Sequence, residues 1–173
     1  GSAFEFLMTD IFVDESVLTK SMGINNKNVI EAQQDFALNK LNYDVWGMSP
    51  CATPDGGYSE FGVSKIGTMV NGYKAGVVTP HASILGINYS TSSVVENIKK
   101  LINNYDVYGE YGFYDCIDMK TKEVGKTYLA LDQAMIFLSI ANYLTDNYIP
   151  KIFEQNEEFK KMMELLKKEE FYN

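Results

Sequence analysis

The sequence predicts an all-α fold of about six helices, with long loops gathered at one end. In several segments apolar residues recur at the three- and four-residue spacing of a helix, and strand-like alternation is rare. Two long irregular segments separate the helical ones; the first holds glycines and prolines, and the second is rich in glycine and tyrosine. With 173 residues, 46% of them hydrophobic, the chain is long enough for one domain with a buried core.

The first clearly periodic helix is expected over residues 26–42, where Asn26 or Asn28 can cap its start. Residues 46–73 then change in texture, because they hold six of the 13 glycines and two of the four prolines. We expect a long loop here, with room for one small β-hairpin. Loops of this length inside a compact domain usually serve function.

Two helices are expected after this loop. A short one can begin at Pro80, since proline suits the first helical position. Ser93 and Glu96 have the spacing of a capping box, which predicts a helix over residues 93–105. Residues 107–126 follow as a second irregular segment.

Two further helices are expected at the end of the chain. Residues 128–144 form a strongly apolar segment of helical length. Residues 150–171 are amphipathic, and their lysines alternate with glutamates as on a solvated helix face.

The acidic balance of the chain argues against nucleic acid and anionic membranes as partners. The net charge is −8, and no basic patch is visible. Asp132 interrupts the best candidate for a membrane-spanning helix. Cys51 and Cys116 belong to no metal-binding pattern and His81 is the single histidine, so no metal or cofactor is predicted. A bridge between the two cysteines stays open.

Asp132 is a carboxylate in an otherwise apolar helix, with Gln133 beside it. A buried carboxylate must be paired, protonated or facing water, because its desolvation is costly. Tyr128, Asp132 and Ser139 share one helix face, which favours a helix that lines a cavity. Pairing with a buried arginine, lysine or backbone amide is the alternative.

Glu5 stands between Phe4 and Phe6. Desolvation by the two rings would raise its pKa, as a general acid requires. The alternative is a glutamate on the exposed side of a short helix.

Residues 108–118, YGEYGFYDCID, mix acids with aromatic rings. This mixture suits carbohydrate, because rings stack on sugar faces while carboxylates bind hydroxyls or exchange protons. The alternative is a loop packed on helix ends. No phosphate-binding glycine loop or nucleophile elbow competes with the two-carboxylate chemistry of glycoside hydrolysis.

Five segments together resemble the glucoamylase-like domain of bacterial endo-β-1,2-glucanases and cyclic β-1,2-glucan synthases. They occur in the order and rough spacing of that family, from Gly1 to about Phe153. The resemblance implies an (α/α)6 toroid, with a sugar cleft at the end where the loops gather. The segments are GSAFEFLM, VWGMSP, GVVTPHAS, YGEYGFYDCID and LALDQAMIFLSIANY.

By position, the resemblance implies that Glu5 and Asp132 are the catalytic residues. Glu5 would be the general acid and Asp132 the base, or the roles would be reversed. Trp46 would stack on a sugar or brace its loop. The residues assigned to substrate binding are Trp46, His81, Tyr111, Phe113, Tyr114, Asp115, Asp118 and Gln133.

Several positions depart from the family pattern close to the implied acids. These departures leave the substrate more open than the reaction class. They are Phe6 for tyrosine, Thr9 for proline, Pro50 for an acid, His81 for an aromatic residue, Asp118 for asparagine and Ala134 for glycine.

A toroid of twelve helices needs roughly 350 residues at ordinary helix and loop lengths. We therefore expect residues 1–173 to be the C-terminal half of such a domain, completed by its N-terminal half or another chain. The expected function is hydrolysis or transglycosylation of β-glucan, with an oligo- or polysaccharide partner and no cofactor. The alternatives are a non-catalytic carbohydrate-binding or interaction module derived from such an enzyme, and a helical scaffold.

Overall fold

A computed structural model describes residues 1–69 and 72–168 of the chain. Helices dominate it, together with two 3-10 turns, η1 (Thr9–Ile11) and η3 (Ser64–Ile66), and a π-helical segment, η2 (Asp35–Lys40). The α-helices are α1 (Ala3–Leu7), α2 (Glu15–Leu18), α3 (Lys20–Gln34), α4 (Pro80–Ile84), α5 (Thr91–Asn104), α6 (Ala130–Leu144), α7 (Tyr148–Phe153) and α8 (Glu157–Leu166).

Seven short strands in the described residues show that the expected all-α fold is met only in part. The hairpin expected in the first loop is present as β1 (Cys51–Ala52) and β2 (Tyr58–Ser59). An antiparallel sheet of three strands and a second hairpin were not expected, because strands of two or three residues are too short to show alternation. These are β3 (Val77–Val78), β6 (Cys116–Asp118) and β7 (Val124–Gly125) in the sheet, and β4 (Tyr108–Gly109) with β5 (Gly112–Phe113) in the hairpin.

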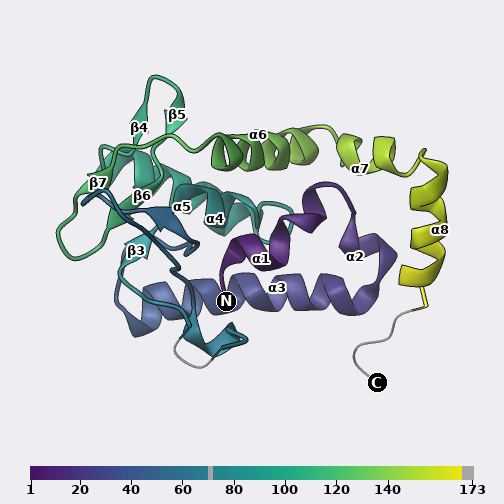
Figure 1. The fold of residues 1–173 in the computed structure, drawn as a ribbon, viewed down its shortest axis with the longest axis horizontal. Helices are drawn as coiled ribbons and strands as arrows, with labels where there is room; N and C mark the ends of the chain where they lie inside the picture. The colour runs from purple at the N-terminus through teal and green to yellow at the C-terminus, as the bar shows by residue number, and fades with distance from the viewer. Residues whose placement is uncertain (70–71, 169–173) are drawn as a thin grey trace.

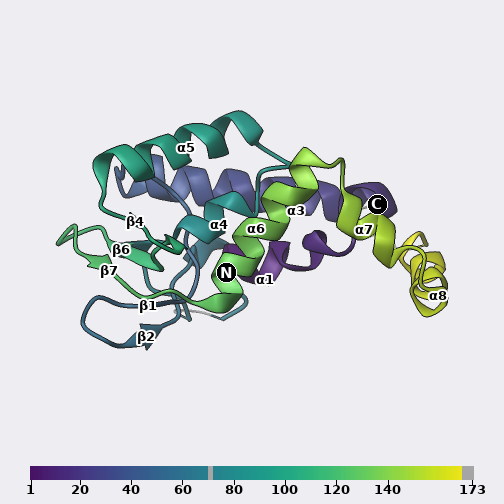
Figure 2. The same ribbon diagram turned by 90° about the horizontal axis from the view of Figure 1, so that it is seen from above.

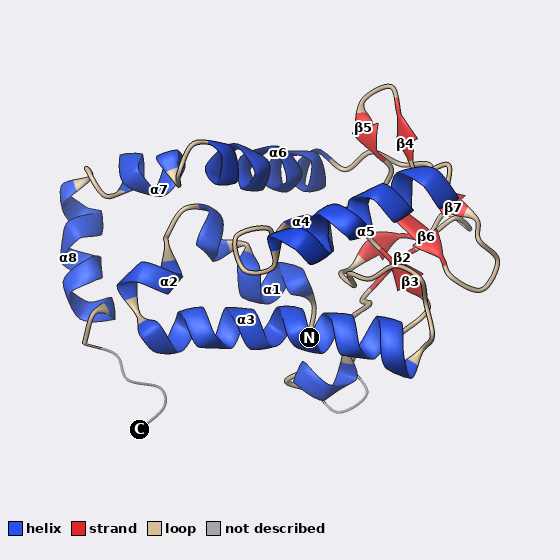
Figure 3. Cartoon of the chain, turned by 180° about the vertical axis from the view of Figure 1, so that it is seen from behind, coloured by secondary structure: helices blue, strands red, loops and turns tan. Residues whose placement is uncertain are grey.

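The helices that matter for the site are stacked side by side. α1 and α4 lie between α3 and α6 (Figure 1), and α4 contacts both α1 and α6. The strands gather at one end of the molecule, while α7 and α8 extend from the other end (Figures 2 and 3). Segments distant in sequence therefore meet where α4 and α6 approach the strands.

The buried core is built around Trp46, Leu7, Ile30 and Leu101, whose side chains are almost inaccessible to solvent. Trp46 is fixed by two buried hydrogen bonds across the fold. Its backbone N–H donates to Asn97 Oδ1 at 2.9 Å, and its carbonyl accepts from Asn97 Nδ2 at 2.8 Å. This pairing attaches the start of the long loop to α5.

The first predicted helix exists but begins earlier than expected. α3 starts at Lys20 and is capped by Thr19, whose Oγ1 accepts from the Met22 N–H at 3.3 Å. The predicted cap Asn26 lies inside the helix and is buried, where its amide donates to Glu15 Oε2 at 2.7 Å. Asn28 also lies inside α3, so both predicted caps are wrong.

The capping box predicted at Ser93 and Glu96 is wrong, because α5 already begins at Thr91. Glu96 instead forms an ion pair with Lys100 at 2.8 Å. The short helix at Pro80 is confirmed. The last predicted helix is divided into α7 and α8, with Asn156 capping α8, and residues 169–171 lie outside the described residues.

α6 begins at Ala130, so Tyr128 precedes the helix and does not share its face with Asp132.

Among the described residues, no helix is long and apolar enough to cross a membrane.

Candidate functional site

The centre of the candidate site is a buried contact between α4 and α6. α4 begins at Pro80, after the N-cap residue Thr79, so His81 lies in its first turn. Asp132 lies in the first turn of α6. His81 Nδ1 is 3.1 Å from Asp132 Oδ2, and the two residues are 2% and 6% exposed. Asp132 Oδ2 has no aligned hydrogen-bond donor in the described structure, so the contact with His81 is a close approach of the two side chains.

Asp115 reaches the same place from the segment between β5 and β6. It is 2% exposed, and its Oδ2 accepts from the Ala52 N–H at 2.6 Å, while Oδ1 has no partner among the described groups. Burial raises the pKa of Asp115 to about 8; the Ala52 hydrogen bond opposes this rise, and the nearby Asp132 adds to it. Near neutral pH, Asp115 therefore favours its protonated form.

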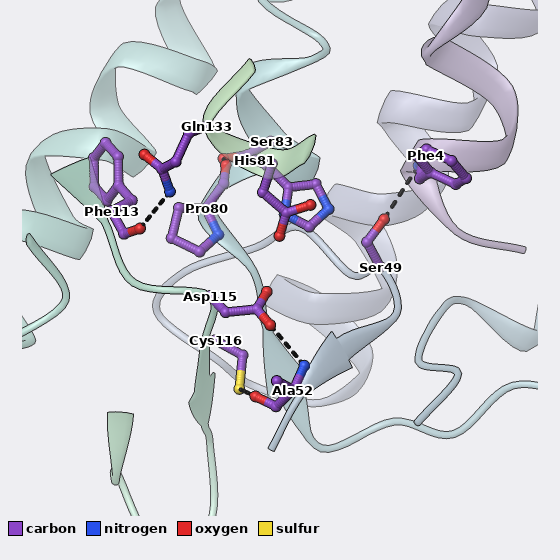
Figure 4. Close-up of polar contacts among 11 residues, drawn as sticks. Phe4, Ser49, Ala52, Pro80, His81, Ser83, Phe113, Asp115, Cys116 and Gln133 are labelled. Carbon is purple, nitrogen blue, oxygen red and sulfur yellow. Dashed lines mark hydrogen bonds and ion pairs between the residues drawn. The ribbon is translucent and has the colours of Figure 1, made fainter. Parts of the chain in front are cut away.

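His81, Asp115 and Asp132 form one cluster, with a donor atom of each within 4.8 Å of the others. Figure 4 shows His81 and Asp115 in the same small region, with Asp115 also bonded to Ala52. Three ligand atoms at this spacing can hold a metal ion, whose charge would offset the repulsion between the two carboxylates. A proton on one of the carboxyl groups also relieves that repulsion. The described contacts do not give Asp132 the alternative partners predicted for it, an arginine, a lysine or a backbone amide; its neighbour is His81.

Glu5 differs from its expected environment. It is exposed on α1 and forms a capping box with Ser2, accepting from the Ser2 N–H at 2.7 Å and the Ser2 hydroxyl at 2.9 Å. The Tyr73 hydroxyl donates to it at 2.5 Å. Partial burial alone would raise the pKa of Glu5, but these hydrogen bonds outweigh it and lower the pKa. The predicted raised pKa is therefore wrong.

The β4–β5 hairpin carries a group of aromatic rings at the surface. Tyr111 is 69% exposed, and its ring lies 5.4 Å from that of Tyr128. Tyr128 also stacks against Tyr114 with centroids 4.8 Å apart. Phe113 is buried beneath them at 6% exposure. The exposed ring of Tyr111 can offer its face to a sugar ring, while Phe113 supports the hairpin from inside.

Gln133 connects this hairpin to α6. Its Nε2 donates to the Phe113 carbonyl at 2.7 Å (Figure 4). Gly112 permits the close approach, because it has a φ of +111° and a Cβ there would lie 2.4 Å from Gln133 Oε1. Gln133 thus holds the hairpin beside Asp132.

Two other predicted binding residues have structural contacts. Trp46 is 2% exposed, so the geometry favours bracing of the loop over stacking on a sugar. Asp118 Oδ1 accepts from the N–H groups of Lys120 and Thr121 at 2.8 and 2.9 Å, which closes the turn between β6 and β7. Neither side chain belongs to the buried cluster.

Sequence reasoning missed several partners of the acids. Ser2 and Glu5 have the Ser-x-x-Glu spacing of a capping box, so that contact had a readable signal. Tyr73 and the Ala52 N–H gave none, since each lies 63 or more residues from the acid that it contacts.

Two cavities of the described structure lie away from the buried acids. One of about 540 Å³ is polar and lies beside α5 and β7, and one of about 550 Å³ is apolar and lies beside α7 and α8. The first is lined by Asp44, Asn104, Tyr105, Asp106, Lys122, Val124 and Lys126. The second is lined by Ile152, Phe153, Asn156, Glu158, Phe159 and Met162. Asp132 lines neither of these two cavities and is itself buried.

Comparison with known proteins gives a consistent family. The model of the Glycoamylase family, described as "Putative glucoamylase", matches residues 1–157. The cyclic beta-(1,2)-glucan synthase NdvB of Rhizobium meliloti is 26% identical over 168 residues, covering 88% of this chain and 6% of that protein.

Two solved structures share the fold. An endo-beta-1,2-glucanase from Chitinophaga pinensis, in complex with sophorotriose and glucose, has a TM-score of 0.80 at 20% identity. A beta-1,2-glucanase from Parabacteroides distasonis has a TM-score of 0.82 at 20% identity. Each match covers 96% of this chain but only 40% and 24% of the respective structures.

Proposed function

Since this chain belongs to the Glycoamylase family, we propose that it forms part of a domain that hydrolyses or transglycosylates β-glucan through two carboxylates. The β-1,2 linkage in the names of its relatives makes a β-1,2-glucan the first substrate to test. The observation that carries the proposal is the buried cluster of His81, Asp115 and Asp132, which brings two acids together at a motif of the family.

Glycoside hydrolysis needs one carboxyl group that gives a proton and one that activates water or attacks the sugar. We assign these tasks to Glu5 and Asp132. The helices that carry them, α1 and α6, both pack against α4. Inverting hydrolysis would require about 6.5–9.5 Å between the two carboxyl groups in the sugar complex, and retention about 5–5.5 Å.

The assignment of acid and base depends on where the proton lies. Hydrogen bonds from Ser2 and Tyr73 lower the pKa of Glu5, whereas burial and Asp132 raise that of Asp115. In the unbound chain these shifts favour Glu5 as the base and Asp115 as the buried carboxyl that holds a proton. A sugar that excludes water from Glu5 would favour the opposite order, because desolvation raises a carboxyl pKa.

The proposed toroid needs a second half, and α6 offers a surface for it. Phe137 and Leu144 are seven residues apart on one face of α6 and are 70% and 72% exposed. We propose that the rest of the domain covers them. Native and denatured mass measurement of the same sample tests this: a second, different chain of similar size in the native particle supports it. A particle that stays monomeric as isolated argues against a completed domain in that sample.

The catalytic assignment is tested on the completed domain with the variants Glu5→Gln and Asp132→Asn. Glu96→Gln, at an exposed position of α5, is the matched control. Reducing ends released from β-1,2-, β-1,3-, β-1,4- and β-1,6-glucans are counted. Both site variants should lose activity by 10²-fold or more, roughly the contribution of one acid or base, while the control keeps it. Activity near that of the wild type in either variant contradicts the assignment of that residue.

A second measurement separates the two roles. An aryl glucoside with a good leaving group needs little acid assistance, so the variant of the general acid should recover activity on it. Added azide can replace the activated water, so it should rescue the variant of the base. Glu5→Gln with azide rescue would support Glu5 as the base.

The alternative function is carbohydrate binding without cleavage. The burial of Asp132 favours it, since a reacting acid must reach its substrate. It predicts that the completed domain binds β-glucan oligosaccharides and releases no reducing ends. Sustained release from any of the four glucans contradicts it.

A further inference from the structure

Cys51 and Cys116 are two free thiols that the proposed function does not use. They come from β1 and β6, strands that are not paired with each other. Both side chains are completely buried, and together with Phe61 and Val77 they form a small apolar cluster apart from the main core. Residues 65 positions apart in the sequence thus share one enclosed space.

Backbone contacts hold the two thiol-bearing segments together. The Cys116 thiol donates to the Ala52 carbonyl at 3.1 Å, and the Ala52 N–H donates to Asp115 (Figure 4). Both polar backbone groups of the residue after Cys51 are therefore bound by Cys116 and its neighbour. Gly125 on β7 leaves the space for this approach, because a Cβ there would lie 3.0 Å from Cys116 Sγ and 2.8 Å from the Ala52 oxygen.

The two thiols are neighbours, because the Cys116 thiol is bonded to the residue that follows Cys51 and both cysteines belong to the same buried cluster. The neighbouring Cys116 thiol and burial together raise the pKa of Cys51 far above the usual range of a thiol. A thiol in that state reacts slowly in the closed structure, because the thiolate is the nucleophile. The pair can therefore react when the chain folds or when the β1 segment opens.

We propose that Cys51 and Cys116 form an intramolecular disulfide in an oxidising compartment. One thiolate attacks a low-molecular-mass disulfide such as glutathione disulfide, and one glutathione thiol leaves. The second cysteine then attacks the mixed disulfide and releases the second glutathione. Both cysteines lose their protons, the two cysteine sulfurs are oxidised and one glutathione disulfide is reduced to two thiols.

The bond would close a loop of 65 residues and fix the segment whose N–H group binds Asp115. Cross-linking a loop of this size restricts the unfolded chain, so the melting temperature of the oxidised protein should rise by roughly 10 °C. The inference concerns the stability of the chain and is independent of the proposed glucan chemistry.

The test refolds the wild-type chain from denaturant in glutathione buffers that range from fully reduced to fully oxidised. Refolding gives the oxidant access to thiols that are buried in the native state. Remaining thiols are alkylated under denaturing conditions and counted by intact mass. The expected result is two labels in reduced buffer, none in oxidised buffer, and a monomeric product with the higher melting temperature.

The single variants Cys51→Ala and Cys116→Ala are the matched controls. Each should lack the rise in melting temperature at every buffer composition, because the remaining cysteine has no partner within the chain. Two labels that persist in oxidised buffer, a disulfide-linked dimer, or an oxidised monomer that melts no higher than the reduced one would overturn the proposal.

Discussion

Asp10 gives a quantitative prediction about stability. It lies in η1 and is half-buried, and its Oδ1 accepts from the Tyr89 hydroxyl at 2.9 Å and the Glu15 N–H at 3.1 Å. Burial raises the pKa of Asp10 from 3.8 to about 7, and the hydrogen bonds from Tyr89 and Glu15 only partly oppose it. The nearby acids Glu15 and Asp14 raise it further.

The sign follows from proton linkage. The folded chain binds the Asp10 proton more tightly than the unfolded chain, so this contribution is complete below about pH 4 and is lost as the pH rises toward 7. From pH 5 to the folded-state pKa of about 7, an interval of about 2 pH units, the folded carboxyl keeps its proton while the unfolded one is already ionised. The stability lost between pH 5 and pH 8 is therefore about 3 kcal/mol. Glu15, whose pKa burial also raises, changes stability in the same direction.

The perturbation is Asp10→Asn, which keeps the Oδ1 acceptor for Tyr89 and Glu15 but cannot ionise. The free energy of unfolding is measured in urea at pH 5 and pH 8 by linear extrapolation. Wild type should lose about 3 kcal/mol more than the variant over this interval, so the variant should be the more stable protein at pH 8.

The exposed residue Asp55 supplies the control. Hydrogen bonds from Thr53 and Gly57 lower its pKa, so it titrates below the interval and Asp55→Asn should leave the pH dependence unchanged. Equal pH dependence in wild type and Asp10→Asn would refute the reasoning, and so would lower stability of Asp10→Asn at pH 8.

Two further substitutions test the packing around the site. Asn97→Ala removes both hydrogen bonds to the buried backbone of Trp46, so urea unfolding should show a loss of about 2–5 kcal/mol; an unchanged midpoint would mean that water replaces them. Gly112→Ala places a methyl group against Gln133 at a positive φ, so thermal unfolding should show a loss of roughly 1–3 kcal/mol, and an increase in stability would contradict the described hairpin.

Helices with several turns of apolar periodicity were the most predictable part of the fold. The segments that became α3, α5 and α6 were identified, since repeated spacing records which face is buried. Their starts were less predictable, because Thr19 caps α3 through a single hydrogen bond and the Ser-x-x-Glu spacing at Ser93 occurs inside α5. The three-stranded sheet was missed because its strands are held by partners distant in sequence.

The candidate site was predictable only as a set of residues. Resemblance to family motifs selected Glu5, Asp115 and Asp132, and the structure brings Asp115 and Asp132 together with His81. It does not place Trp46 or Asp118 in that cluster, because Trp46 fills the core and Asp118 closes a turn. Aromatic and acidic residues can either line a site or support the fold, so composition alone cannot separate site residues from structural ones.

The sequence by itself determined the helical segments, the acidic character of the chain and the order of the motifs, because periodicity, charge and local spacing are properties of neighbouring residues. Only the tertiary structure decided the state of each acid. Ser2 and Tyr73 lower the pKa of Glu5, whereas burial beside Asp132 raises that of Asp115. A carboxyl pKa depends on water and on the groups within a few ångströms, and folding alone brings those groups together from distant parts of the chain.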